Sequence, residues 1–240
     1  MKRSKITILL AIVLGMTFHS CLDLEPQDQL GGKNMWTSVN DYKQFANTFY
    51  SWTRDFSSVV YDGTHSDKRS DLITYQSYNE FSRGINSIPS SDANYTDNYK
   101  HIRRTNLLLQ NAEAYAKPED IKQYIGEAYF FRAYSYFDLL QLYGDVIITK
   151  KPLDITDPEM KVKRNDRSEV VDLIIDDLNH AVENLPAFKE LTTEEEGRIS
   201  KEGAQAFLSR VALYEGTWQK SRNGNQNTCL LYTSDAADDM

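Results

Sequence analysis

The stretch from residue 126 to residue 143 restricts the fold of this chain more than any other part of the sequence. It reads GEAYFFRAYSYFDLLQLY, contains no proline, and is followed by Gly144 and a short extended run at residues 145–149. A glycine just after a helix allows the left-handed backbone conformation with which many helices end. Apolar side chains occur at helical spacing on several faces of the stretch, as in helices that are buried on all sides. These residues therefore predict a helix in the core of a helical domain.

The aromatic residues of this stretch have two possible roles: they form a platform on which a ligand stacks, or they pack in the core. Side chains that point to several faces of one helix do not converge on one ligand, so we assign them to the core. The same setting predicts a buried or half-buried ion pair for Arg132, because a buried charge needs a partner. The aromatic residues in question are Tyr129, Phe130, Phe131, Tyr134, Tyr136 and Phe137.

Capping residues and apolar spacing predict two helices before this one and set its start. Ser38 and Asp41 have the spacing of a capping box, which begins the first helix. The second helix covers about residues 96–116, and the aromatic helix begins at Pro118, because proline is favoured in the first turn of a helix. Along the first helix the residues expected to be buried are Val39, Tyr42, Phe45, Phe49 and Trp52.

Two more helices follow the aromatic one. The fourth has a regular apolar spacing and stops at Pro186, and the fifth runs from its N-cap Ser200 to Gly216. No alternation typical of strands occurs outside residues 145–149, so the predicted fold class is all-α. Small residues on the fifth helix let another helix approach closely and suggest tetratricopeptide-like stacking of helix pairs, although no strict repeat of 34 residues is present.

Residues 1–20 have the pattern of a lipoprotein signal peptide. A basic start precedes an apolar run at residues 6–18 that would span roughly 20 Å as a helix, less than the hydrocarbon core of a bilayer. The run ends in a loose version of a bacterial lipobox, with a small residue just before Cys21. We therefore expect cleavage before Cys21 and lipidation of its thiol. The alternative is an ordinary signal peptide that is cut nearby and leaves an unmodified cysteine.

Residues 223–240 differ from the rest of the chain because they have no helical periodicity. Residues 229–239 resemble translated read-through of a sequencing adapter, so we predict that this tail is not native. Residues 21–222 would then form the N-terminal part of a domain that belongs to a longer protein. The alternative is a genuine polar tail.

Composition argues against several classes of function. The chain carries a net charge of −8 and no basic stripe, which argues against nucleic acid as a partner. Cys21 and Cys229 are its only cysteines, so a disulfide framework or a cysteine zinc site is not expected. The sequence contains no nucleophile elbow, phosphate-binding loop, dinucleotide fingerprint or zinc-protease motif, so we predict no enzyme, cofactor or metal. An acidic loop could supply the pair of carboxylates that glycoside hydrolysis needs. Any acidic loop could do so, however, and this feature does not indicate a glycosidase.

The stretch from residue 61 to residue 81, joined by Tyr95, combines tyrosines with charged side chains. Sugar recognition needs aromatic faces for the C–H groups of the ring, and carboxylates, amides or guanidinium groups for the hydroxyls. We therefore predict ligand contacts here. The alternative is that the charged residues pair locally and the tyrosines pack on the helices. The candidate residues are Asp67, Arg69, Tyr75, Tyr78 and Tyr95.

Several segments, in their order along the chain, resemble the SusD/RagB family of outer-membrane nutrient-binding lipoproteins. The aromatic stretch at residues 126–146 resembles the family's hallmark helix, and residues 99–106 match its Y-x-x-I-x-x-x-N pattern. Residues 167–186 and 197–214 resemble its next two blocks. Together with Cys21, the resemblance covers most of residues 21–218. Two features depart from the family: the lipobox is loose, and a C-terminal half that supplies part of the binding face is missing.

The resemblance implies a fold of stacked, tetratricopeptide-like helix pairs and a role in nutrient capture without catalysis. A member of this family is lipid-anchored at the outer membrane and exposed at the cell surface. It binds oligosaccharide, or peptide in some branches, and passes it to a SusC-like TonB-dependent transporter. The family region that contains a Ser-Asp pair, here Ser66 and Asp67, contributes ligand contacts in some members. The alternative from another class is a helical-repeat scaffold that binds only protein.

Overall fold

A computed structural model of the chain describes residues 35–53, 83–154 and 156–222. Within these ranges the secondary structure is helical, and one isolated bridge between Val146 and Asn165 is the only β-type pairing. The all-α prediction is confirmed. The α-helices are α2 (Val39–Asn47), α4 (Ala93–Glu113), α5 (Lys122–Tyr143), α6 (Arg167–Asn184) and α7 (Lys201–Ser221). The short 3₁₀ helices are Thr48–Trp52, Pro118–Ile121, Pro158–Lys161, Phe188–Glu190 and Thr193–Glu195.

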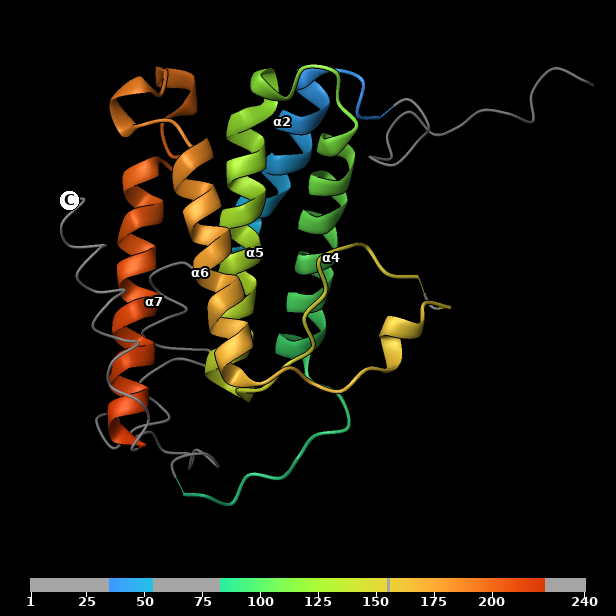
Figure 1. The fold of residues 1–240 in the computed structure, drawn as a ribbon, viewed down its shortest axis with the longest axis vertical. Coiled ribbons are helices and arrows are strands. Elements are labelled where there is room, and N and C mark those ends of the chain that lie inside the picture. Colours follow the sequence, from blue (N-terminus) through green and yellow to red (C-terminus); the bar gives the residue numbers. More distant parts are fainter. Residues whose placement is uncertain (1–34, 54–82, 155, 223–240) are drawn as a thin grey trace, which may run out of the picture. The chain divides into compact units, whose positions relative to one another are not determined.

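Helices α4, α5, α6 and α7 pack in chain order, each against the next, and successive helices run in opposite directions (Figure 1). Helix α2 packs against α5 and α4. Helix α5 therefore has neighbours on both sides and is the most deeply buried element, as its sequence predicted. Of its aromatic residues, Phe130, Phe131, Tyr136 and Phe137 are buried, and Tyr129 and Tyr134 are half-buried. Among the helices that the structure describes, none is both long and apolar enough to cross a bilayer.

The predicted helix boundaries are correct where a side chain or glycine sets them locally. The Ser38 hydroxyl accepts a hydrogen bond from the Asp41 amide at 3.3 Å, and the Asp41 carboxylate accepts one from the Ser38 amide at 2.8 Å. At the start of α7 the Ser200 hydroxyl accepts a hydrogen bond from the Gly203 amide at 3.3 Å, a cap without the reciprocal bond. Gly144 ends α5 with a φ of 71°, a conformation that few other residues adopt without strain.

Other boundaries were predicted wrongly. Helix α7 does not stop at Gly216 but continues to Ser221, and Gly216 is buried inside it. The indole of Trp218 lies 4.0 Å from the Arg167 guanidinium, and Arg167 also pairs with Glu215 at 2.7 Å. These contacts offset the roughly 1 kcal/mol that a glycine costs within a helix. Helix α4 starts at Ala93 rather than near Thr96, because the Asp92 side chain accepts a hydrogen bond from the Asn94 amide. It also ends at Glu113, before the predicted residue 116, and Pro118 begins a 3₁₀ turn rather than an α-helix.

A buried ion pair joins α5 to α6 and confirms the expectation for Arg132. Its Nε and Nη2 donate to the two carboxylate oxygens of Asp177 at 2.8 and 2.6 Å. The Arg132 side chain is 6% exposed and that of Asp177 is 0% exposed. Near one end of the same interface, a Cβ atom on Gly126 would lie only 2.9 Å from Leu185 Cγ. Glycine at this position allows the start of α5 to approach the end of α6.

Candidate functional site

Most of the residues predicted to contact ligand lie outside the described part of the chain. Asp67, Arg69, Tyr75 and Tyr78 fall in residues 54–82, so their contacts stay predictions. The same holds for Cys21, for the predicted signal peptide at residues 1–20 and for the tail at residues 223–240. Tyr95 is described, and it lies on the first turn of α4 beside a pocket.

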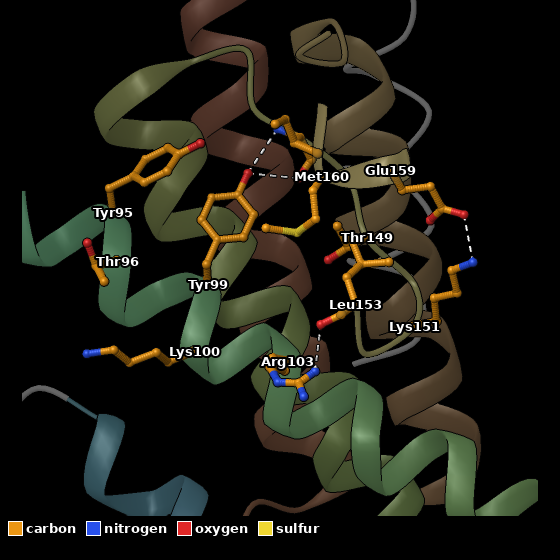
Figure 2. Close-up of a pocket in the computed structure, with 11 residues that line it drawn as sticks. Tyr95, Thr96, Tyr99, Lys100, Arg103, Thr149, Lys151, Leu153, Glu159 and Met160 are labelled. Carbon is orange, nitrogen blue, oxygen red and sulfur yellow. Dashed lines mark hydrogen bonds and ion pairs between the residues drawn. The ribbon is translucent and has the colours of Figure 1, made fainter. Parts of the chain in front are cut away.

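This pocket, which we call the tyrosine pocket, has a volume of about 490 Å³ and lies between α4 and the extended segment that follows α5 (Figure 2). Helix α4 supplies one wall through residues on successive turns. The extended segment supplies the other wall through alternate residues, as expected when every second side chain of an extended chain points the same way. The residues from α4 are Tyr95, Thr96, Tyr99, Lys100 and Arg103, and those from the segment are Ile147, Thr149, Lys151 and Leu153.

Two tyrosines form the aromatic part of the pocket. The rings of Tyr95 and Tyr99 lie side by side on α4, with centroids 4.8 Å apart, and face Thr149, Leu153 and Met160 across the pocket (Figure 2). The Tyr95 ring also makes an edge contact with Tyr143 at 5.2 Å. Burial and a neighbouring tyrosine raise the pKa of Tyr99, so its hydroxyl stays protonated. The planes of the two rings are tilted by 50° to each other, so the pair presents two aromatic faces at an angle to whatever enters the pocket.

Charged side chains surround these rings. Lys151 pairs with Glu159 at 2.7 Å, and the Arg103 guanidinium donates to the Leu153 carbonyl at 3.0 Å (Figure 2). Lys100 pairs with Asp97 at 2.7 Å. All three cations are more than half exposed, so they can exchange these partners for ligand hydroxyls at little cost. An aromatic surface with exposed hydrogen-bonding groups at its edge suits a polyhydroxylated ligand.

A smaller and more polar pocket of about 160 Å³ lies beside another face of α4. Its aromatic part is the ring of His101 stacked on Trp52, with centroids 4.1 Å apart and planes 14° apart. Asp138 is buried, also lines the pocket and accepts a hydrogen bond from the side-chain amide of Asn98 at 3.0 Å. The sequence did not predict this pocket, because Trp52 was assigned to the core and His101 was not among the candidate residues. The polar residues of α4 at positions 94, 97, 98 and 101 share one helical face, a pattern that indicates such a site.

We expect His101 to make stability depend on pH. Burial lowers its pKa from 6.5 to about 4; Arg104 and Lys100 act in the same direction, and Asp97 opposes them. Between pH 6.5 and 4, His101 binds a proton in the unfolded chain but not in the folded protein. Its contribution to the free energy of unfolding is therefore fully present above pH 6.5 and is lost as the pH falls towards 4. His101→Phe keeps the stack on Trp52 without a titrating group and should flatten this decline in chemical denaturation. If the variant declines as steeply as the wild type, another group causes the loss.

Comparisons with known proteins agree with one another. The SusD-like family model described as "starch-binding associating with outer membrane" matches residues 22–213. A SusD-like protein of Formosa agariphila is 28% identical over 233 residues, which cover 89% of this chain and 42% of the relative. The crystal structure of a SusD-like protein from Bacteroides fragilis matches with a TM-score of 0.65 and 25% identity, over 88% of this chain and 41% of that protein.

A third match is a solved structure described as a laminarin-binding SusD-like protein. It is 30% identical with a TM-score of 0.51, over 58% of this chain and 30% of that protein. The chain thus spans less than half the length of each of these three proteins.

Proposed function

The chain belongs to the SusD-like family, and on that premise we propose that it captures oligosaccharides at the bacterial cell surface. In this proposal Cys21 carries the lipid that anchors the protein to the outer membrane. The bound oligosaccharide passes to a SusC-like TonB-dependent transporter, and the protein acts by binding alone, without catalysis. Residues 21–222 would be the N-terminal part of the binding domain.

The observation that supports this function most directly is the tyrosine pocket. Its Tyr95 and Tyr99 rings offer the apolar surface that covers the C–H face of a sugar, and Lys100, Arg103 and Lys151 offer donors for hydroxyl groups. The rings stand on a helix whose position is set by the core, so the pocket is formed before the ligand arrives. The laminarin-binding relative supports oligosaccharide as the ligand class.

Capture of this kind needs modest affinity. A ligand held at the mouth of a transporter is at a high effective concentration there, so uptake competes with diffusion into the medium. Exposed, exchangeable ion pairs around the pocket fit reversible binding better than permanent retention.

Tyr95→Ala is expected to weaken oligosaccharide binding about ten-fold, or about 1.4 kcal/mol, because it removes the outer aromatic surface of the pocket. Isothermal titration with malto- and laminari-oligosaccharides measures the loss. Tyr95→Phe should bind nearly as well as the wild type, since it keeps the ring. Tyr115→Ala is the matched control, because Tyr115 packs on Tyr42 beyond the other end of α4, roughly 30 Å away along the helix.

Two outcomes would count against the proposal. Equal loss in the Tyr95→Ala and Tyr115→Ala variants would mean that the tyrosine pocket is not the binding site. If the wild-type protein binds none of the oligosaccharides but still binds a protein partner, the result would favour a helical-repeat scaffold. Delivery is tested separately by co-purification of a TonB-dependent transporter from outer membranes, and its absence would leave binding without transfer.

A further inference from the structure

The extended wall of the tyrosine pocket is held by side chains rather than by a sheet. Tyr99 Oη donates to the Ile147 carbonyl at 2.8 Å and accepts from the Ile147 amide at 2.9 Å. The Thr149 amide donates to Tyr136 Oη at 2.8 Å. In the described part of the chain, a single backbone-to-backbone bridge adjoins this wall, in which the Asn165 amide donates to the Val146 carbonyl at 2.9 Å. Strand-like geometry persists here because helical side chains replace the missing neighbouring strand.

Asn106 on α4 makes the central contact to this wall. Its amide nitrogen donates to the Thr149 carbonyl at 2.9 Å and to the Lys151 carbonyl at 3.3 Å. Both residues line the tyrosine pocket, whereas Asn106 is 0% exposed and does not line it. The Asn106 side chain therefore acts on the pocket from behind.

The orientation of the Asn106 amide is set by Arg132. The guanidinium Nη1 of Arg132 donates to Asn106 Oδ1 at 2.8 Å. If the amide were flipped, its NH₂ group would face the guanidinium, which has no acceptor for it. Arg132 is itself held by both carboxylate oxygens of Asp177. A chain of hydrogen bonds thus runs from α6 through α5 and α4 to the pocket wall, and the bonds that Arg132 makes to Asp177 and Asn106 are charge-assisted.

We propose that Asp177, Arg132 and Asn106 form a positioning relay that sets the place of Thr149 and Lys151 and thereby the affinity of the tyrosine pocket. The relay rests on the proposed function for its effect on binding, but not for its effect on the wall. Its residues touch no ligand. They fix which way the amide of Asn106 points, and that amide fixes two carbonyls of the wall.

Asn106→Asp tests the relay with almost no change in shape. The new carboxylate keeps an acceptor for Arg132, but it replaces the donor that faces two carbonyl oxygens with a second acceptor. We expect amide hydrogen exchange at residues 147–153 to rise about ten-fold or more as this wall opens locally. The dissociation constant for laminari-oligosaccharide should rise about ten-fold with it.

Val211→Ala is the matched control, because it removes apolar contacts from α7 without touching the wall. Both variants are compared at the same interval below their own unfolding temperatures. The control should leave exchange at residues 147–153 and sugar affinity unchanged.

The proposal of a relay is wrong if Asn106→Asp leaves amide hydrogen exchange in the wall unchanged. It is also wrong if Val211→Ala raises this exchange by the same factor. Faster exchange in the wall with unaltered affinity would overturn the link to binding. If the wild type binds no oligosaccharide, the proposed function fails, and the exchange data still decide whether the relay positions the wall.

Discussion

Arg132→Met is expected to lower the free energy of unfolding by about 3–5 kcal/mol, because it leaves the Asp177 carboxylate buried without its cation. The substitution also removes the donor to Asn106 Oδ1, so two buried polar groups lose a partner at once. Urea denaturation followed by circular dichroism measures the loss. An unchanged slope would show that the native state rather than the unfolded state is affected.

The double variant Arg132→Met with Asp177→Leu distinguishes a lost interaction from an exposed charge. Replacing both members of a buried ion pair by apolar residues is often close to neutral, so the double variant should be more stable than either single one. Asn106 stays without its donor and keeps the rescue incomplete. Strictly additive losses would contradict a coupled pair.

Phe131→Ala is expected to cost about 3–5 kcal/mol as well, because it opens a cavity at the centre of the aromatic core. The Phe131 side chain is 1% exposed, and its ring contacts those of Phe49, Tyr50 and Trp52 on the 3₁₀ helix that follows α2. It contacts Phe130 and Tyr134 on α5 too. Thermal unfolding of the variant measures the loss.

Phe131→Leu provides the control, because it keeps most of the apolar volume and should cost less than the alanine variant. The folded fraction of Phe131→Ala should bind oligosaccharide as the wild type does, since Phe131 does not line the tyrosine pocket. Weaker binding with unchanged stability would instead mean that the aromatic residues of α5 form a ligand platform, which is the reading that the sequence analysis rejected.

The parts of the fold that were predictable from sequence depend on neighbours close in the chain. The caps at Ser38 and Ser200 and the end of α5 at Gly144 are made by residues within one helical turn. The end of α7 was not predictable in this way. It depends on Arg167, which lies on another helix and binds Glu215 and Trp218 from across the interface.

The site divides in the same manner. Tyr95 was a candidate because its residue type and position beside an aromatic-rich loop suit sugar binding. Tyr99 and Thr149 were not, since each became part of a pocket only when the segment after α5 folded back along α4. Trp52 and His101 also meet only through tertiary packing, because the 3₁₀ helix that contains Trp52 places its ring on the ring of His101 of α4.

The sequence by itself determined the all-α class, the buried character of α5, the need of Arg132 for a partner and the resemblance to the SusD-like family. These properties follow from residue types and from the spacing of residues that are close together in the sequence. Only the tertiary structure decided that the partner is Asp177, that Asn106 turns its amide to the wall and that two tyrosines face an extended segment. Those choices depend on which surfaces meet when helices pack, because packing joins residues that the chain itself keeps apart.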